Sequence, residues 1–350
     1  MSKSRETHRT GPVSTEPEFA LPTAGDIAAS DARSVPASEL PDDVAANRDA
    51  ILKSPSYRLA EYDVDFLKRK ENRPLRMQLE LLKTETLLRE HGIDATVVIF
   101  GGTQIVPRER AEVVAREARA NAKRVPHDRK VARALNRAES ILAKSRFYDE
   151  AREFSRLVSL AVPAEGRSKL VVMTGGGPGI MEAANRGAFE VGAKSIGLNI
   201  DLPHEQEPNP YITPELCFQF HYFAMRKFHF ILRAAALVVF PGGFGTLDEL
   251  FDTLCLRQTR RMQQIPVILY GREYWDSVID LSRLADEGVV DDEDLKMIDY
   301  AETPREAWDI IARFHRLTLS EQQWPLEKPQ RGKVAAQVSS PKSAVGNDDE

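Results

Sequence analysis

The sequence has 350 residues, 42% of them hydrophobic, which is enough to bury a substantial core in one large domain or two smaller ones. Its formal net charge of −5 excludes a global positive field that would attract nucleic acid. We therefore expect no nucleic acid partner, and an anionic ligand would need a local site.

The two cysteines, Cys217 and Cys255, lie in apolar surroundings outside any CxxC pair. This argues against a disulfide framework or a zinc site and for a reducing compartment, and we expect both side chains to be buried. No apolar run reaches the roughly 18 residues of a membrane-spanning helix, and the polar N-terminus lacks the apolar core of a signal peptide. We expect a cytoplasmic protein with no membrane partner.

The predicted elements begin after a tail. Residues 1–45 are rich in Pro, Ser, Thr, Ala and acids, and residues 321–350 have a similar character, so both are predicted to be disordered. Residues 46–94 form a predicted N-terminal helical segment, in which Leu75, Leu79 and Leu82 recur at helical spacing. The main domain is placed at residues 95–320.

The main domain opens with residues 95–100, a β-branched apolar run that predicts a strand buried on both faces. Residues 107–162 form a helical insertion of two or three helices that is expected to cover one side of a sheet. Its Arg and Lys residues alternate with acids, which favours a solvated helix face over a nucleic-acid patch.

From residue 169 onward, strand-like and helix-like segments alternate, which predicts an α/β fold with a doubly wound, mostly parallel sheet and helices on both faces. Strands are predicted at residues 170–174, 195–200, 217–220, 236–240 and 266–270. Helices are predicted at residues 179–191, 223–234, 246–258, 273–287 and 304–317.

Two glycine-rich loops carry the first functional signal. Gly175, Gly176, Gly177 and Gly179 lie between a predicted strand and a predicted helix, where bare backbone N–H groups can approach an anion. Four glycines in five positions exceed what a tight turn needs, and the spacing is neither a dinucleotide fingerprint nor a Walker A loop.

The second loop runs through residues 241–249 in the same strand-to-helix context. Gly242, Gly243 and Gly245 free the backbone, and Thr246 adds a hydroxyl, so a phosphate is expected on the helix N-terminus. Glu249 has two interpretations: it closes a capping box with Thr246, or it reaches the ribose of the same ligand.

A third signal is Met225-Arg226-Lys227 near the start of a helix. Arg226 and Lys227 face either solvent or an anionic ligand. Positive charge near a helix N-terminus is unfavourable to the helix dipole, which weakly favours an anion nearby. His221 and His229 lack a catalytic or metal-binding context and are expected to be satisfied or exposed. Nothing resembles a metal ligand set, and no cofactor is expected.

Together, the two loops and the Met-Arg-Lys segment resemble the LOG family, often labelled lysine decarboxylase-like, whose members act as nucleotide phosphoribohydrolases. The family pattern GGGxxG is slightly compressed here, whereas PGGxGTxxE is matched throughout residues 241–249. The resemblance covers about residues 96–317 and implies a Rossmann-like fold and a homodimer or larger assembly. The family label suggests pyridoxal phosphate chemistry, which nothing in the chain leads us to expect.

The resemblance also implies a reaction, the hydrolysis of a nucleoside 5′-monophosphate such as AMP or a cytokinin riboside monophosphate to free base and ribose 5-phosphate. The family's essential arginine falls on Arg226 and its essential glutamate on Glu249. The long tails, the N-terminal helices and the helical insertion depart from the compact plant-type members and are similar to longer bacterial members. Substrate contacts are placed at Gly101, Gly102, Thr103, Gly175, Gly176, Gly177, Gly179, Met181, Glu182, Met225, Lys227, Gly242, Gly243, Gly245 and Thr246.

In the predicted mechanism, Glu249 stabilises oxocarbenium character on the ribose and orients or deprotonates water, while Arg226 orients Glu249 or binds phosphate. Two alternatives remain open. One is a non-catalytic nucleotide or molybdopterin-type carrier that uses the same loops. The other is an interaction protein that senses nucleotides through its tails and helical insertion.

Overall fold

The computed structural model describes residues 40–162, 168–202 and 207–319. The chain divides into two compact units, Met1–Asn72 and Arg73–Glu350. The first contains α1 (Asp42–Lys53) and α2 (Val64–Leu67), with 3₁₀ turns at Pro55–Tyr57, Ala60–Tyr62 and Lys70–Asn72.

Helix α1 begins inside the predicted tail. Asp42 and Asp43 lie in its first turn and Lys53 in its last, which suits the helix dipole, but none of its side chains is buried. Only residues 42–45 of α1 fall in the predicted tail, and the rest of the helix lies in the segment 46–94 that was predicted to be helical. The rest of the predicted tails, except for residues 40 and 41, lies outside the described residues.

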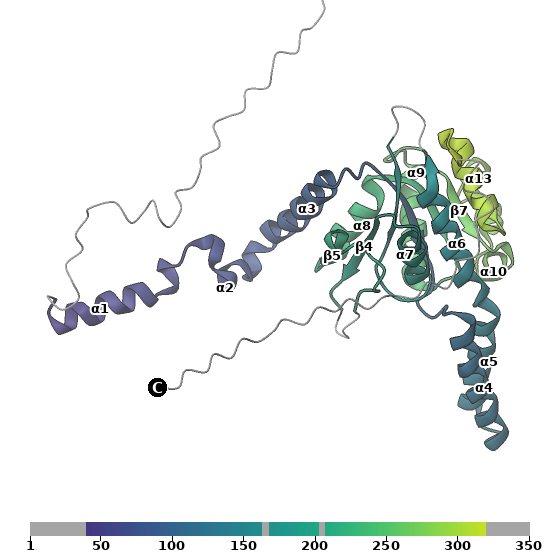
Figure 1. The fold of residues 1–350 in the computed structure, drawn as a ribbon, viewed down its shortest axis with the longest axis horizontal. Helices are drawn as coiled ribbons and strands as arrows, with labels where there is room; N and C mark the ends of the chain where they lie inside the picture. The colour runs from purple at the N-terminus through teal and green to yellow at the C-terminus, as the bar shows by residue number, and fades with distance from the viewer. Residues whose placement is uncertain (1–39, 163–167, 203–206, 320–350) are drawn as a thin grey trace, which may run out of the picture. The chain divides into compact units, whose positions relative to one another are not determined.

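Seven parallel strands form the sheet of the second unit (Figure 1). Their order is β5-β4-β3-β1-β6-β7-β8. The first strand, β1, therefore lies in the middle of the sheet, paired with β3 on one side and with β6 on the other. This confirms the predicted parallel α/β fold. The strands are β1 (Ala95–Phe100), β3 (Leu170–Thr174), β4 (Ser195–Ile200), β5 (Cys217–Phe220), β6 (Ala234–Val239), β7 (Val267–Tyr270) and β8 (Ile298–Ala301), and a separate antiparallel pair joins β2 (Ala161–Val162) to β9 (Thr318–Leu319).

Burial on both faces explains why β1 reads as a continuous apolar run. Val97 and Ile99 belong to the hydrophobic cluster on one face, and Val98 and Phe100 to the cluster on the other. The edge strand β8 was not predicted, because its sequence IDYA includes an exposed aspartate and is only partly buried.

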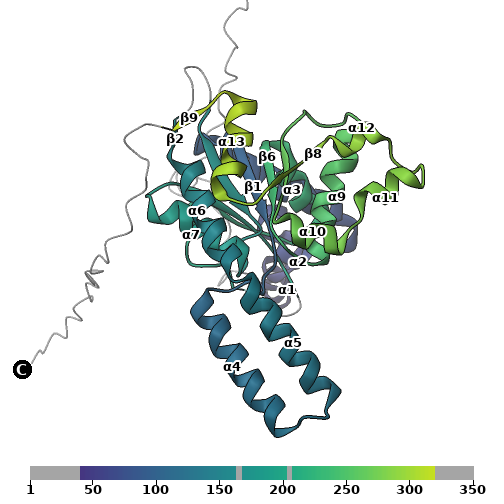
Figure 2. The same cartoon turned by 90° about the vertical axis from the view of Figure 1, so that its right-hand side faces the viewer.

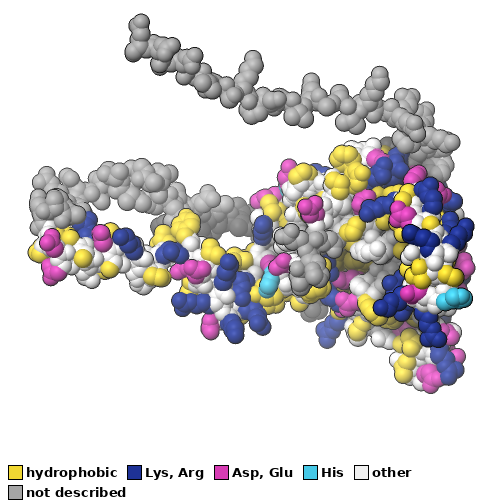
Figure 3. Space-filling view, turned by 90° about the horizontal axis from the view of Figure 1, so that it is seen from below, with side chains coloured by type: hydrophobic (Ala, Val, Ile, Leu, Met, Phe, Trp, Pro, Cys, Tyr) yellow, Lys and Arg dark blue, Asp and Glu magenta, His cyan; other side chains and the backbone are white. Residues whose placement is uncertain are grey.

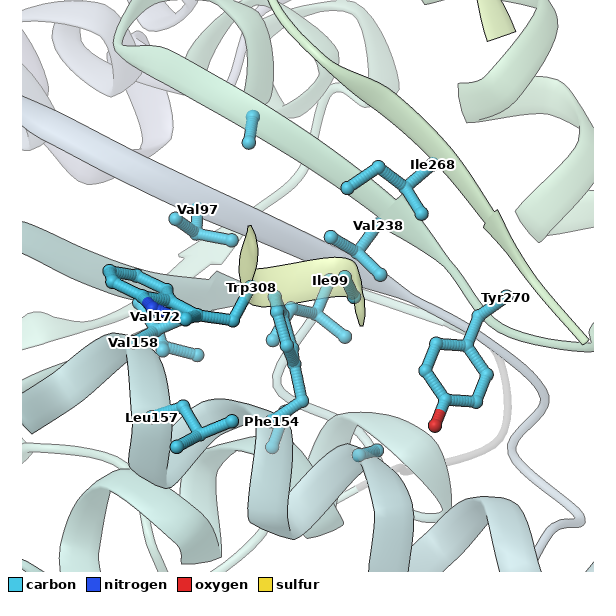
Figure 4. Close-up of a cluster of buried hydrophobic side chains, with 14 of the residues drawn as sticks. Val97, Ile99, Phe154, Leu157, Val158, Val172, Val238, Ile268, Tyr270 and Trp308 are labelled. Carbon is cyan, nitrogen blue, oxygen red and sulfur yellow. The ribbon is translucent and has the colours of Figure 1, made fainter. Parts of the chain in front are cut away.

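Helices cover both faces of the sheet. On one face, α6 (Arg146–Leu160), α7 (Ile180–Glu190) and α13 (Pro304–His315) bury side chains such as Phe154 and Trp308 against the strands (Figure 4). On the other face lie α3 (Arg73–Glu90), α8 (Phe223–Leu232), α9 (Phe244–Gln258) and α10 (Arg272–Val278). The helix predicted at residues 273–287 is in fact two, because Asp280 caps a separate α11 (Leu281–Asp286), and α12 (Asp292–Leu295) follows.

The helical insertion does not cover the sheet as predicted. Only α6 packs on the strands, while α4 (Arg108–Arg124) and α5 (Arg129–Lys144) pair with each other in a hairpin that extends away from the domain body (Figure 2). Ala111 and Ala115 of α4 and Ala138 of α5 are the buried residues of this hairpin. Such small side chains let the two helices approach closely without needing the sheet.

The leucines that recur at helical spacing lie in one helix, as predicted, although Leu75, Leu79 and Leu82 of α3 are exposed and the helix buries Thr84 and Leu88. The expectation that both cysteines are buried was wrong. Cys255 is exposed and Cys217 is only half-buried, because flanking apolar residues do not fix which face of a helix or strand a cysteine occupies. Among the described residues, no helix combines the length and hydropathy needed to cross a bilayer.

Candidate functional site

A cavity of about 380 Å³ lies where the loops after β1, β3 and β6 meet. Because the sheet order places β1 between β3 and β6, the carboxyl ends of these strands converge at the point where the direction of winding reverses. The predicted site residues that line the cavity are Gly101, Gly102, Thr103, Gly175, Met181, Arg226, Gly243, Gly245, Thr246 and Glu249.

Glu249 and Arg226 lie together at this cavity. The Arg226 Nη2 and Glu249 Oε1 atoms are 3.7 Å apart, and their side chains are 16% and 4% exposed. Glu249 Oε1 and Arg226 Nε are buried without a hydrogen-bond partner among the described residues. Because a buried polar atom is normally paired, this arrangement leaves hydrogen-bonding capacity for a ligand or water.

Burial sets the ionisation of the carboxyl group. Loss of solvent raises the pKa of Glu249 to about 7, even though Arg226 and Lys227 act in the opposite direction. The carboxyl group therefore exchanges its proton near neutral pH. A group with a pKa near the working pH is well suited to accept and return a proton.

Aromatic rings hold the Arg226 guanidinium in place. Its central carbon lies 5.2 Å from the Phe223 ring centroid and 5.5 Å from that of Phe230, one on each side along α8. Phe230 is itself buried against Phe100 in an edge-to-face contact. The cation is thus positioned by packing rather than by a close hydrogen bond to Glu249.

The capping-box interpretation of Glu249 is wrong. Helix α9 begins at Phe244, and its N-cap residue is Gly243, which makes no side-chain capping hydrogen bond. Thr246 is therefore inside the first turn rather than before it, and Glu249 is turned into the cavity instead of toward the N-cap. Among the described residues, no side chain accepts a hydrogen bond from the N-terminal N–H groups of α9.

The glycines of the second loop differ in whether the fold has room for a side chain at their positions. A Cβ atom on Gly243 or Gly245 would meet no other atom within 4 Å, and neither residue has a positive φ. At Gly242 it would lie 2.1 Å from the Thr246 hydroxyl oxygen. Folding therefore requires a glycine at position 242, whereas Gly243 and Gly245 leave open space along the cavity wall.

In the first loop, chain geometry accounts for much of the glycine content. Gly176 and Gly179 both have φ of +73°, and a Cβ there would collide with Asn199 and with the Gly102 carbonyl, respectively. Gly175 is the loop glycine that lines the cavity, and a Cβ there would meet the flexible Met181 side chain at 2.9 Å and Arg226 Nη1 at 3.9 Å. Most of this loop is thus shaped by close packing between strand ends.

A buried polar network that the sequence analysis missed supports the first loop. Asn209 Nδ2 donates to the carbonyl oxygens of Gly176 and Gly177, each at 3.1 Å, and to Asn185 Oδ1 at 2.9 Å. Thr174 Oγ1 donates to Asn185 Oδ1 at 2.7 Å and accepts from the Gly176 N–H at 3.0 Å. The network holds the loop backbone through residues that do not themselves line the cavity.

Comparison with protein families matches residues 181–311 to a family described as "possible lysine decarboxylase". Over this segment, which is less than half of the chain, the sequence is similar to that family. The segment that matches the possible lysine decarboxylase family includes Arg226, the second glycine loop and Glu249, and it begins just after the first loop.

Among the solved structures similar to the chain are the following two. One is the molybdenum cofactor binding protein of the phototrophic bacterium Rippkaea orientalis, with 21% identity over 48% of this chain and 87% of that protein, and a TM-score of 0.32. The other is TM1055, a structural-genomics target, with 22% identity over 63% of this chain and 99% of that protein, and a TM-score of 0.39. Comparison with curated proteins gives no match.

Some predicted contact residues within or next to the segment shared with the possible lysine decarboxylase family do not line the cavity. Lys227 Nζ binds Asp248 at 2.8 Å and borders a different cleft. The Glu182 carboxylate accepts a hydrogen bond of 2.6 Å from the Tyr148 hydroxyl, and Met225 packs into the core. The others outside the lining are Gly176, Gly177, Gly179 and Gly242.

The histidine expectations hold in part. His221 is largely exposed, as expected. His229 is buried, with Nδ1 3.3 Å from the Glu85 carboxylate, and neither ring nitrogen has a hydrogen-bond partner among the described residues. Burial lowers its pKa, so the ring is neutral at physiological pH.

Several lining residues were not predicted from sequence. Asn199 and Ile200 are the last residues of β4, and Leu202 follows just after it. Ligand contacts are common at the carboxyl ends of parallel strands, so the strand rule itself offered a signal. Phe100, Phe223, Phe230 and Phe244 also line the cavity. Their apolar character gave no hint that they flank a site rather than a core.

Proposed function

We propose that the chain is a hydrolase that cleaves the N-glycosidic bond of a nucleoside 5′-monophosphate, such as AMP or a cytokinin riboside monophosphate. The products are the free base and ribose 5-phosphate. The observation that carries this proposal is the buried carboxyl group of Glu249, unpartnered and beside Arg226, at a cavity whose wall includes a glycine-rich helix N-terminus.

The 5′-phosphate is assigned to the start of α9. Gly243, Gly245 and Thr246 line the cavity there, and the free N–H groups together with the helix dipole favour an anion. Glu249 follows Thr246 by about one helical turn. A substrate held by its phosphate at this end would present its ribose toward the carboxylate, which uses remote binding energy to orient the reacting bond.

The ionised Glu249 carboxylate acts as general base in this proposal. It takes a proton from water as the water oxygen bonds to C1′, while the bond from C1′ to the base nitrogen breaks and its electron pair goes to that nitrogen. The nitrogen takes a proton from solvent, and Glu249 returns its proton to solvent. Arg226 stays charged beside Glu249, and its positive charge offsets the negative charge of the ionised carboxylate. Ile200, Leu202 and Phe223 offer an apolar wall for the base.

The family description also suggests a decarboxylase. Amino acid decarboxylases of the pyridoxal phosphate type need a lysine amine for the Schiff base. No lysine is among the described residues that line the cavity, and Lys227 is ion-paired to Asp248 and faces another cleft. The site does not fit that cofactor, and we derive no step through it.

The direct test is to incubate the purified protein with AMP, GMP, CMP, UMP and N6-substituted AMP and to measure free base and ribose 5-phosphate. Release of both products, abolished by Glu249→Gln, supports the proposal. Tight binding of AMP without release of adenine would show a carrier instead. Arg226→Lys tests whether the charge alone suffices, since lysine lacks the planar guanidinium that stacks on Phe223 and Phe230.

We also propose that the chain forms a homodimer or a larger assembly of identical chains. Helices α8 and α9 expose several large apolar side chains: Phe228 is 45% exposed, Leu232 46% and Phe251 40%. Phe244, at the mouth of the cavity, is 91% exposed. An apolar surface of this kind favours a protein contact. Light scattering on the full chain and on Phe251→Asp measures the assembly directly.

A further inference from the structure

The α4–α5 hairpin differs in charge from the rest of the chain. Between residues 108 and 144 the sequence has eleven lysines and arginines against five acids, a net charge of +6, whereas the whole chain carries −5. The hairpin extends from the domain body, and α4 and α5 contact mainly each other (Figure 2). Its charge therefore lies away from the negatively charged remainder.

Along α5, three arginines form a row that we call the arginine stripe: Arg129, Arg133 and Arg137. They recur every four residues, which places them within about 80° of arc and about 6 Å apart along the helix axis. All three side chains are exposed. Lys130 follows Arg129 at the exposed tip of the hairpin, near the start of α5. Figure 3 shows how Lys and Arg side chains gather on parts of the surface.

The acids of α5 and its cap do not neutralise the arginine stripe. The Asp128 carboxylate accepts hydrogen bonds from the backbone N–H groups of Lys130 and Val131 and so caps the helix. Glu139 is held by Arg119 of α4 in a bidentate ion pair at 2.6 and 2.7 Å. Within residues 40–162, 168–202 and 207–319, no side-chain partner is found for the stripe arginines.

This arrangement opposes the intrinsic stability of α5. Arg129 and Lys130 lie in the first turn, where positive charge is unfavourable to the helix dipole. Arg129, Arg133 and Arg137 are like charges at spacings of four residues, which also destabilise a helix. The charged side chains do not stabilise the packing of the hairpin either, because the apolar side of α5 already faces α4. A binding role explains why the charges are tolerated.

We propose that the arginine stripe binds the phosphodiester backbone of duplex DNA without reading its sequence. Arginine is suited to phosphate because its guanidinium donates in a planar fork. Residues 108–144 contain no Phe, Tyr or Trp, so the stacking on which single-strand binding depends is missing. A membrane surface is disfavoured because the stripe carries no apolar side chains to insert and the buried side of α5 is covered by α4.

The sequence pattern alone favoured a solvated face, since basic and acidic residues alternate along the insertion. The structure separates them in space, because the acids of α5 and its cap are committed within the hairpin and the stripe arginines are not. Nucleotide hydrolysis plays no part in this inference. The stripe lies on the hairpin, and none of its residues lines the candidate cavity.

The test is fluorescence anisotropy with a labelled 20-base-pair DNA duplex and the full-length protein at 50–200 mM salt. The variant R129Q/R133Q/R137Q is compared with R261Q/R283Q/R313Q, which removes the same charge from exposed arginines of the domain body. Loss of three phosphate contacts should reduce the slope of log K against log salt by about 2.7 and weaken binding at least about tenfold at low salt. The control variant should lose much less.

Equal losses in the two triple variants would overturn the assignment to the stripe, as would failure of the wild-type protein to bind the duplex at 50 mM salt. Binding to polyglutamate or to vesicles of anionic lipid in preference to DNA would also overturn it. The charge-preserving variant R129K/R133K/R137K should keep most of the salt dependence, and thermal melting of each protein confirms folding. These readouts do not depend on enzymatic activity.

Discussion

Replacement of Glu249 by glutamine should make the protein more stable while it removes the proposed activity. The carboxyl group has a pKa of about 7 in the folded chain against 4.5 for an unperturbed glutamate, because burial outweighs the attraction of Arg226. This difference corresponds to about 3 kcal/mol. Glutamine has nearly the same shape and never ionises, so it escapes this cost.

The size of the stabilisation depends on pH. The folded pKa lies above the unfolded one, so between pH 4.5 and about 7 the folded chain binds more protons than the unfolded chain. Stability therefore falls as pH rises through this window, and the full cost is present above it. Glu249→Gln should gain about 3 kcal/mol at pH 8.5 and close to nothing at pH 4.5.

Thermal and urea unfolding at pH 8.5 and pH 4.5 measure this difference. For a domain of this size, 3 kcal/mol corresponds to an increase in Tm of about 6–12 °C. Asp248→Asn is the matched control, since its side chain is 54% exposed and its loss should change stability by less than about 0.5 kcal/mol. AMP hydrolysis by Glu249→Gln should fall at least about a hundredfold.

Two outcomes would refute this reasoning. If Glu249→Gln is less stable than the wild-type protein and stays active, the carboxyl group serves the helix rather than the chemistry. If its stability is unchanged at both pH values, the buried carboxylate carries no desolvation cost and the pKa of Glu249 stays at its ordinary value.

The other predictions concern pH, the loops and the polar network. The kcat/KM for AMP should rise about tenfold per pH unit below pH 7 and level off above it, because Glu249 must be ionised to accept a proton; a flat profile from pH 5 to 8 would contradict a base at this position. Gly243→Ala should melt within about 2 °C of the wild-type protein but raise the KM for AMP at least about tenfold, since its added methyl group meets only open cavity space. Gly242→Ala, which would collide with Thr246, should instead lower the Tm. Asn209→Ala should cost about 1–3 kcal/mol in urea unfolding and raise the KM more than it lowers kcat, because the Gly177 carbonyl and Asn185 Oδ1 lose the side-chain donor of Asn209; a loss of stability with KM unchanged would show a purely structural role.

The sequence determined the sheet well, because buried parallel strands are short apolar runs with glycine at their ends. It was less informative where burial depends on distant partners. Leu75 and Leu79 have the spacing of a core-facing stripe, yet the side of α3 that is buried is set by its contacts with other elements. The two halves of the predicted helix at residues 273–287 are separated by a local cap at Asp280 that periodicity does not register.

For the candidate site, the motif residues Arg226 and Glu249 and the second glycine loop could be selected from sequence. Their roles could not be ranked, because the choice between capping and cavity exposure for Glu249 depends on where α9 begins, and helix starts shift by one or two residues without a strong signal. Asn185 and Asn209 were overlooked, since a polar residue in an otherwise ordinary segment shows its importance only when its hydrogen-bond partners are known.

The central position of β1 has a consequence for how the chain acquires its binding capacity. The loops after β1 and β3 come from segments separated by three helices, and the loop after β6 is reached only once the chain has passed through β5 and α8. A partly assembled sheet therefore offers an incomplete binding site for the proposed nucleotide. Occupancy by substrate would favour the finished sheet over its precursors by mass action, so that ligand concentration, and not sequence alone, helps decide how much of the chain is folded.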